Sequence, residues 1–392
     1  MVLRTDAEVL SANAPCPGGT ARGAVRPVTR PRVWLVIGDK AGDNAQLEVV
    51  RERLGWPVEY RRLAFKPRYV KGKPLFRASL HHVDLAGSDP LRPPWPDVVF
   101  TIGRRPSMAA LWIKAQSGGH TRVVQFGRPK RWLNRFDLIV APAQYAVPDA
   151  PNVLNITLPL MRADPDRLAQ AREAWQERLA GLPRPLIAVL IGGSTNPFRM
   201  DAEVVQALLA EAERYAGPEG ALYISTSRRT PDSAAAALEA LKPRNARLYR
   251  WGDPGSDNPY YGLLAHADAF LVTGDSISML TEVTRLGRPL AIYPLPQTDA
   301  AGKYLVRAGT WLTRHLPGLA RHPILEHLGL LVFPRELTRI HDWLYARGLA
   351  VRAGQPLPAE PTDVSAEDEV DAVIARIRAL CGVKPEETPR QL

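Results

Sequence analysis

Cysteine is nearly absent from the sequence, which has only Cys16 and Cys381 among its 392 residues. Neither belongs to a CxxC pair or to a cysteine–histidine spacing typical of zinc, so we expect no disulfide framework and no metal site. No apolar run reaches the ~18 to 20 residues of a membrane span, and residues 1–30 lack the apolar core of a signal peptide. These absences favour a cytoplasmic protein.

Positive charge is what the sequence has in excess, with a formal net charge of +11. Such a balance favours anionic partners, which include nucleic acid, acidic membrane surfaces and the phosphates of a nucleotide sugar. The sequence has no zinc finger, RNP motif or helix-turn-helix pattern, which argues against nucleic acid. A chain of this length is too long for one ordinary core and suits two domains.

Short apolar runs alternate with helical patterns from Val33 onward, which predicts parallel sheets covered by helices. The predicted strands are 33–37, 58–63, 97–102, 123–126, 138–141, 186–191, 221–225, 248–251, 269–272 and 290–293. The predicted helices are 45–54, one from Pro106, 162–179, 202–215 with Asp201 as N-cap, one opened by Thr230 and Pro231, one ending near Gly287, 303–312, 335–347 and 366–380.

The fold class expected is therefore α/β, with two Rossmann-like domains whose parallel sheets face an interdomain cleft. The expected divisions are a disordered tail (1–30), a first Rossmann-like domain (31–165), a second Rossmann-like domain (183–300), a helical segment that bridges back to the first domain (301–350), and a Pro-rich linker, helix and tail (351–392).

Three loops of the second half follow predicted strands, where parallel sheets bind ligands. Glycines let the backbone approach a pyrophosphate, hydroxyls donate hydrogen bonds, and arginines bind anions. The first loop carries Gly192, Gly193, Ser194 and Thr195, and the second carries Ser227, Arg228 and Arg229. A tight glycine turn and solvated surface arginines are the alternative interpretations.

The third loop carries Asp275, Ser276, Ser278 and Glu282. Ser278 and Glu282 are four residues apart and share one face of a predicted helix start. Glu282 could accept the ribose hydroxyls while Ser276 and Ser278 hold phosphate oxygens. The alternative is a helix cap, with Ser276 or Ser278 as N-cap and Glu282 in solvent.

Two loops of the first half suggest an acceptor site. Asp39 and Asp43 are candidates for a general base, and the candidate acceptor-binding residues are Lys40, Asn44, Gln46 and Arg104. An Asp/Gly turn and a helix cap explain the same residues without a ligand. His81 and His82 have no metal-like spacing and are expected to form a surface pair.

A basic run interleaved with aromatic residues spans 61–77. Its cations are Arg61, Arg62, Lys66, Arg68, Lys71, Lys73 and Arg77. The mixture suits an anionic membrane surface or a lipid-linked acceptor, and a solvated basic loop is the alternative.

Several stretches together resemble the mitochondrial-fission ELM family, over approximately residues 33–348. They are GDKAGDNAQ, TIGRRPSMAALWIKAQSGG with VVQFGRP, FDLIVAP, LIGGSTNPF, ISTSRRTP and NPYYGLLAHADAFLVTGDSISMLTEV. The bacterial branch of that family is assigned to the glycosyltransferases. The resemblance implies a glycosyltransferase-B arrangement, with the acceptor held by the first domain (31–165) and the nucleotide-sugar donor held mainly by the second (183–300), in the glycine, arginine and Asp275–Glu282 loops. It also implies an envelope glycan or lipopolysaccharide-core acceptor.

The function expected is sugar transfer from a nucleotide sugar, without a metal ion or a bound cofactor, by a cytoplasmic protein that can lie on the inner membrane. Two alternatives remain open. One is a membrane-associated scaffold that retains the fold without catalysis, and the other is a nucleotide-sugar epimerase.

Overall fold

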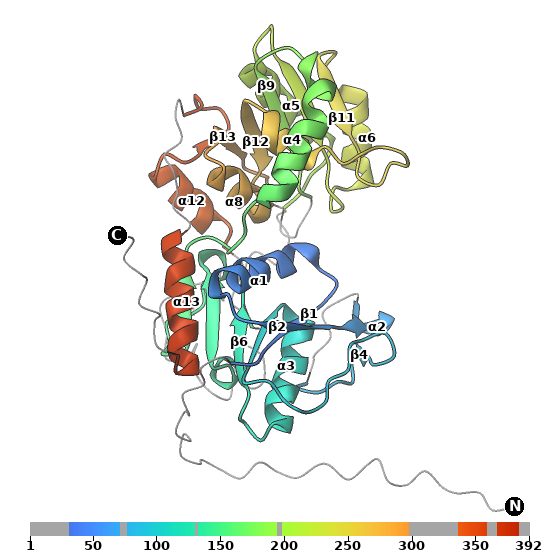
Figure 1. Cartoon of the computed structure of the whole chain (residues 1–392). Helices are drawn as coiled ribbons and strands as arrows, with labels where there is room; N and C mark the ends of the chain where they lie inside the picture. Colours follow the sequence, from blue (N-terminus) through green and yellow to red (C-terminus); the bar gives the residue numbers. More distant parts are fainter. Residues whose placement is uncertain are drawn as a thin grey trace, which may run out of the picture.

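The computed structural model describes residues 31–70, 77–129, 132–193, 198–297, 336–358 and 367–383. Two six-stranded parallel sheets form the cores of two domains, the first blue to green and the second mainly green to orange in Figure 1. The expected α/β class with two Rossmann-like parallel sheets is confirmed. The predicted tail at 1–30, the predicted helix at 303–312 and most of the predicted bridging segment lie outside the described residues.

The first sheet has the strand order β2-β1-β5-β6-β7-β8. Its strands are β1 (Val33–Ile37), β2 (Val58–Arg62), β5 (Val98–Ile102), β6 (Arg122–Phe126), β7 (Leu138–Pro142) and β8 (Val153–Ile156). Strands β1, β5 and β7 are buried at every position, because helices cover both faces of the sheet. This burial explains why these strands read as continuous apolar runs.

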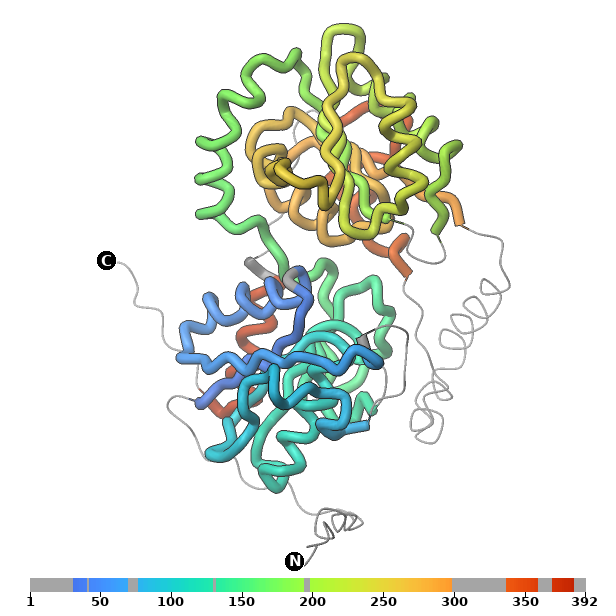
Figure 2. Tube along the Cα trace, turned by 90° about the vertical axis from the view of Figure 1, so that its right-hand side faces the viewer, coloured from blue at the N-terminus to red at the C-terminus, as the bar shows by residue number. Residues whose placement is uncertain are grey.

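Helices α1 (Ala41–Leu54) and α13 (Glu367–Cys381) cover one face of this sheet, and α3 (Arg104–Gln116) covers the other. The last described helix therefore returns to the first domain, as the red segment beside the blue and green one shows in Figure 2. Its Val373 and Ile377 are fully buried against the sheet. A two-stranded antiparallel pair, β3 (Ala64–Phe65) with β4 (Val83–Asp84), and the short α2 (Pro67–Val70) extend the domain.

The second sheet has the strand order β11-β10-β9-β12-β13-β14. Its strands are β9 (Leu186–Leu190), β10 (Ala221–Ser225), β11 (Ala246–Tyr249), β12 (Ala269–Thr273), β13 (Leu290–Tyr293) and β14 (Val351–Arg352). Strands β9, β10 and β12 are buried throughout. This order, with the first strand of the domain central, is that of a Rossmann dinucleotide-binding sheet.

Helices cover both faces of the second sheet as well. On one face lie α5 (Ala202–Ala216) and α6 (Asp232–Leu241). On the other lie α4 (Pro165–Ala180), α7 (Tyr260–His266), α8 (Ile277–Arg285) and α12 (Thr338–Ala346). The Asp201 side chain accepts a hydrogen bond from the Val204 N–H, which confirms the predicted N-cap of α5.

Hydrogen bonds connect the second domain to the first domain and to the segment between the two sheets. The Arg285 guanidinium on α8 donates to the Met161 carbonyl, in the segment between the two sheets. The Glu336 N–H donates to the Gln144 carbonyl at 2.8 Å, in the 3-10 helix η2 (Ala143–Tyr145) of the first domain. After β14, the last strand of the second sheet, α13 packs on the first sheet again.

Candidate functional site

In each sheet the strand order reverses direction at one point, between β1 and β5 in the first and between β9 and β12 in the second. Loops that leave the carboxyl ends of two such strands run to opposite faces of the sheet, and ligands bind in the space between them. The candidate residues of the sequence fall at these two points. The second-domain residues follow β9, β10 and β12, and the first-domain residues follow β1 and β5.

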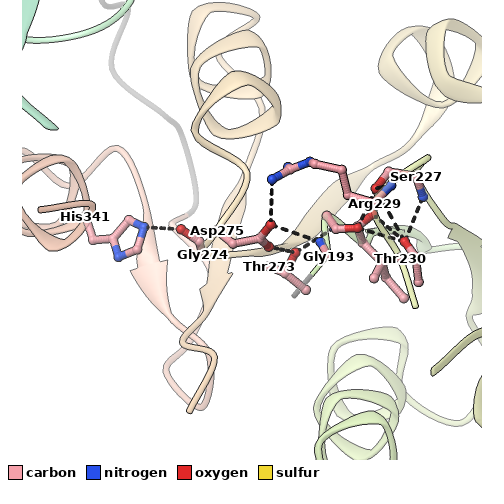
Figure 3. Close-up of polar contacts among 10 residues, drawn as sticks. Gly193, Ser227, Arg229, Thr230, Thr273, Gly274, Asp275 and His341 are labelled. Atoms are coloured by element: carbon pink, nitrogen blue, oxygen red, sulfur yellow. Dashed lines mark hydrogen bonds and ion pairs between the residues drawn. The ribbon is translucent and has the colours of Figure 1, made fainter. Parts of the chain in front are cut away.

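Asp275 joins the loops of the second domain (Figure 3). Its carboxylate accepts hydrogen bonds from the Gly193 N–H at 2.9 Å and from the Thr273 hydroxyl at 2.8 Å, and it lies 3.3 Å from the Arg229 guanidinium. The side chain has no exposed surface. Burial raises the pKa of the Asp275 carboxyl, although Arg229, Thr273 and Gly193 each act to lower it.

Gly192 and Gly193 are required by the closeness of these loops. A Cβ at Gly192 would lie 2.4 Å from the Asp275 carboxylate oxygens, and one at Gly193 would lie 2.1 Å from the Arg229 carbonyl oxygen. The Gly192 N–H also donates to the Thr273 hydroxyl at 2.8 Å. The two glycines therefore let the loops after β9, β10 and β12 meet at one place.

The loop after β10 is fixed to the same glycines. The hydroxyls of Ser227 and Thr230 both donate to the Gly192 carbonyl, the second at 2.7 Å. The Arg229 side chain reaches back to Asp275, whereas Arg228 is exposed. Ser194 and Thr195, expected to bind the donor, lie outside the described residues.

Helix α8 begins beside this cluster. Ser276 is its N-cap residue and is buried, but its side chain makes no capping hydrogen bond, while Ser278 is exposed. The first turn of α8 thus has no side-chain cap, which leaves its N–H groups available to an anion. Ser278 and Glu282 lie one turn apart on this helix, as predicted.

Glu282 is mostly buried and accepts a hydrogen bond from the Tyr260 hydroxyl on α7. Burial raises the pKa of the Glu282 carboxyl, against the opposing effects of Tyr260 and Arg167. Burial and the Glu282 charge in turn raise the pKa of Tyr260 well above its ordinary value. Glu282, the carboxylate predicted to bind the ribose, is therefore positioned by Tyr260, which was not among the predicted site residues.

His341 on α12 is a second residue that sequence reasoning missed. Its Nε2 lies 2.8 Å from the Gly274 carbonyl oxygen, and a Cβ at Gly274 would meet the ring at 2.8 Å (Figure 3). Burial lowers the pKa of His341, against the effect of that carbonyl. A neutral ring then donates to Gly274, which holds the loop after β12 from its other side. The two residues are 67 positions apart, so no local pattern in the sequence predicts their contact.

The first-domain residues line a cavity of about 170 Å³ at the β1/β5 reversal. Its walls are Gly38, Asp39, Lys40, Asp43, Asn44, Ile102, Gly103, Arg104, Arg105 and Pro106. The structure therefore brings together the predicted Asp39, Asp43, Lys40, Asn44 and Arg104. Gln46 lies further along α1 and is not one of the lining residues.

The two candidate bases differ in their partners. Asp39 accepts a hydrogen bond from the Arg105 guanidinium at 3.1 Å. Asp43, in the first turn of α1, lies 3.8 Å from the Lys40 ammonium, a pair that is more than one-third exposed on both sides. The Asn44 amide donates to the Gly38 carbonyl at 2.9 Å and fixes the loop. Asp43 is thus the more weakly engaged carboxylate.

The expectation of a surface histidine pair is wrong for His82, which is fully buried. Its ring stacks on Phe65 at 5.9 Å between centroids, and its Nε2 lies 2.9 Å from the Arg105 carbonyl oxygen. Burial lowers the pKa of His82 to about 4, against the opposing effect of that carbonyl. His82 supports the start of α3 and does not face solvent.

The basic run is only partly a solvent-facing surface. Arg61 pairs with Glu59 at 2.6 Å and its guanidinium lies 4.2 Å from the Trp34 ring centre. The Lys66 ammonium donates to the His81 carbonyl at 3.0 Å. Lys71 and Lys73 lie outside the described residues. Part of the charge is therefore used to hold β2 and the β3–β4 segment.

The described ranges contain neither a membrane-spanning helix nor a cluster of metal-binding side chains. None of the described helices is long and apolar enough to cross a membrane. Over the same ranges, His, Cys, Asp and Glu side chains form no group of three that could hold a metal ion.

The two Rossmann-like parallel sheets, with a last described helix that returns to the first domain, define a two-domain α/β protein of the glycosyltransferase-B type. A family model described as "Mitochondrial fission ELM1" matches residues 41–307, which is more than half of the chain. The chain belongs to this family.

Individual proteins similar to the chain include "Mitochondrial fission protein ELM1" of Arabidopsis thaliana, which is 30% identical over 219 residues. That match covers 50% of this chain and 51% of the plant protein, so the chain matches about half of its relative's length. "Uncharacterized protein RP120" of Rickettsia prowazekii is 24% identical over 306 residues, covering 68% of this chain and 84% of that protein.

Among solved structures, the UDP-GlcNAc 2-epimerase of Methanocaldococcus jannaschii is similar with a TM-score of 0.47 and 8% identity. The match covers 89% of this chain and 99% of the epimerase.

Proposed function

We propose that the protein is a glycosyltransferase that moves a sugar from a nucleotide-sugar donor to a hydroxyl of a lipid-linked or envelope glycan acceptor. The observation that carries this proposal is the joining of three strand-end loops by Asp275 at the β9/β12 reversal. In a Rossmann sheet of this order, that position receives the phosphates of a nucleotide.

The donor is assigned to the second domain. The uncapped first turn of α8 supplies N–H groups for a diphosphate, and Ser278 lies exposed beside them. Arg228 and Arg229 add positive charge at the end of β10. Glu282, one turn along α8, is placed to accept ribose hydroxyls with its carboxylate oriented by Tyr260. Ser194 and Thr195 complete the proposed donor loop.

The acceptor is assigned to the cavity of the first domain. Asp43 removes the proton of the acceptor hydroxyl, whose oxygen attacks the anomeric carbon of the donor sugar. The bond from that carbon to the diphosphate oxygen breaks, and the leaving diphosphate carries away the negative charge. Arg228, Arg229 and the α8 amides stabilise that charge without a metal ion.

The scaffold alternative depends on the basic run at 61–77. Contacts within the domain reduce the charge that this run can present to a membrane. Arg61 and Lys66 are committed to contacts within the domain. An epimerase needs the same donor site but no acceptor. Conversion of a donor sugar in the absence of any acceptor therefore separates that alternative from transfer.

A donor screen tests the proposal. UDP-, GDP-, ADP-, CMP- and dTDP-linked sugars are added to the wild type and to Glu282→Ala, and the Tm of each mixture is recorded. A ligand that binds only the native state raises the Tm. We expect one nucleotide class to stabilise the wild type and to lose most of this effect in Glu282→Ala. Stabilisation by no member of the panel, with the protein folded, overturns the proposal.

A further inference from the structure

Arg105 forms part of the wall of the first-domain cavity with one nitrogen unsatisfied. Its side chain is 10% exposed, and its Nη2 donates to Asp39. Its Nη1 is buried and has no hydrogen-bond partner in the part of the chain that the structure describes. An unmade hydrogen bond of a buried polar group costs about 1–3 kcal/mol, and more for a charged one. Buried polar groups are nearly always hydrogen-bonded, so this nitrogen requires a partner, which a bound ion or an ordered water supplies.

The position of Arg105 is fixed by its surroundings. Its guanidinium carbon lies 4.4 Å from the centre of the Phe65 ring, at a distance typical of a cation–π contact. Its carbonyl oxygen is 2.9 Å from Nε2 of the buried His82. The side chain is therefore held at the cavity from both the β3–β4 segment and its own backbone. A solvated surface arginine has no such supports.

Two helices begin at the same cavity. Helix α1 starts after Lys40 and α3 starts after Gly103, and neither N-cap residue makes a side-chain capping hydrogen bond. Gly103 has a φ of 85°, which only glycine adopts readily, and this conformation turns the chain from β5 into α3. First-turn N–H groups and the positive ends of two helix dipoles thus converge on one space.

The charges of the lining residues also favour an anion. Three cations, Lys40, Arg104 and Arg105, share the wall with Asp39 and Asp43. Burial and the neighbouring Arg105 both lower the pKa of Arg104, so two guanidinium groups stand close together in a partly desolvated place. A bound anion reduces this repulsion.

We propose that the first-domain cavity binds an oxyanion, a phosphate or carboxylate group of the acceptor, with Arg105 as its anchor and the first turns of α1 and α3 as N–H donors. The acceptor class named here is a glycan or lipid that carries such a group next to the hydroxyl that receives the sugar. The acceptor role rests on the proposed function, whereas the anion site itself rests only on the geometry of the cavity.

The test uses inorganic phosphate and acetate as probes at constant ionic strength, measured by calorimetry and by Tm on the full chain. We expect saturable binding of at least one anion by the wild type, weakened roughly 10-fold or more in Arg105→Lys. The lysine keeps the charge but loses the second donor nitrogen. The anion that binds more tightly identifies the group on the acceptor.

Arg92→Lys is the matched control, because it makes the same change at an exposed arginine of the first domain that does not line the cavity. It must leave the affinity for the probe within about 2-fold. No saturable binding of either anion, or equal affinity in the wild type and Arg105→Lys, overturns the inference. So does a loss of the same size in Arg92→Lys.

If Arg105→Lys does not fold, hydrogen exchange of the wild type, measured with and without the probe, tests the inference instead. The bound probe must slow exchange of the amides at 41–44, 104, 105, 107 and 108, and protection found only elsewhere overturns the inference. The donor screen does not involve Arg105. A Glu282-dependent donor with no Arg105-dependent anion refutes this inference alone, and the reverse result refutes the proposed function alone.

Discussion

The Gly193 N–H donates to the buried carboxylate of Asp275 at 2.9 Å, across 82 residues of sequence. This bond ties the loop after β9 to the loop after β12, the two strands between which the second sheet reverses its order. Asp275 therefore holds in place the loops of the proposed diphosphate site, and its carboxylate also pairs with Arg229.

Replacement of Gly193 by alanine tests this closeness. The added Cβ would lie 2.1 Å from the Arg229 carbonyl oxygen, which is backbone and must shift. We expect Gly193→Ala to lower the free energy of unfolding by about 1–3 kcal/mol in urea titrations and to weaken donor binding. Gly181→Ala is the control, because a Cβ there meets nothing within 4 Å. Equal losses in both variants would show that the loops are not in contact.

Glu282→Gln tests the buried carboxylate through pH. Because burial raises the folded-state pKa of Glu282, its favourable contribution is present below the ordinary value of 4.5 and is lost as pH rises through the raised pKa. Glutamine remains neutral. The stability of Glu282→Gln relative to the wild type should therefore increase with pH from about 4 upward.

Urea unfolding at several pH values measures this difference. Ser278→Ala, an exposed change on the same helix, should give a difference that does not vary with pH. A Glu282→Gln difference that is flat or falls as pH rises would contradict the assigned burial.

His82 should make the protein sensitive to acid. Its pKa is about 4 in the folded protein against an ordinary value of 6.5, so the unfolded chain binds the proton more readily between these values. The stability is fully present above 6.5 and is lost as pH falls towards 4, by up to about 3 kcal/mol. His82→Phe should remove this part of the acid sensitivity. His120→Phe, at an exposed histidine of the same domain, should leave it, and an unchanged acid profile in His82→Phe would refute the assignment.

The return of α13 to the first domain predicts a stability effect far from either site. Ile377 is fully buried against the first sheet, so Ile377→Ala should cost about 2–5 kcal/mol in urea unfolding. Ala375→Ser, exposed on the same helix, should change stability by less than about 0.5 kcal/mol. If Ile377→Ala has no more effect than the serine variant, α13 does not pack as described.

The main strands could be predicted because helices bury both faces of each sheet, which leaves short, continuous apolar runs in the sequence. The helix starts were less accurate, since α1 begins at Ala41 and α3 at Arg104. Strands β3, β4 and β14 have two residues each, too short for any periodic pattern, and their pairing depends on distant residues.

The candidate residues could be predicted from the sequence because they follow strands. The residues that contact them could not be predicted. Tyr260 reaches Glu282 from another helix, and His341 reaches Gly274 across 67 residues. The sequence predicts Asp275 to bind the donor, but its carboxylate accepts hydrogen bonds from other residues of the protein. The local sequence predicts where a side chain lies along its helix, strand or loop. The contacts of that side chain depend on how the helices and strands pack.

Hydrogen exchange of the wild type with its stabilising nucleotide sugar tests the central claim most directly. The account predicts slower exchange at the amides of Gly192 and Gly193, of 227–230 and of the first turn of α8, because the donor closes over these three loops. Protection that avoids all three, in a protein that binds the donor, would contradict it.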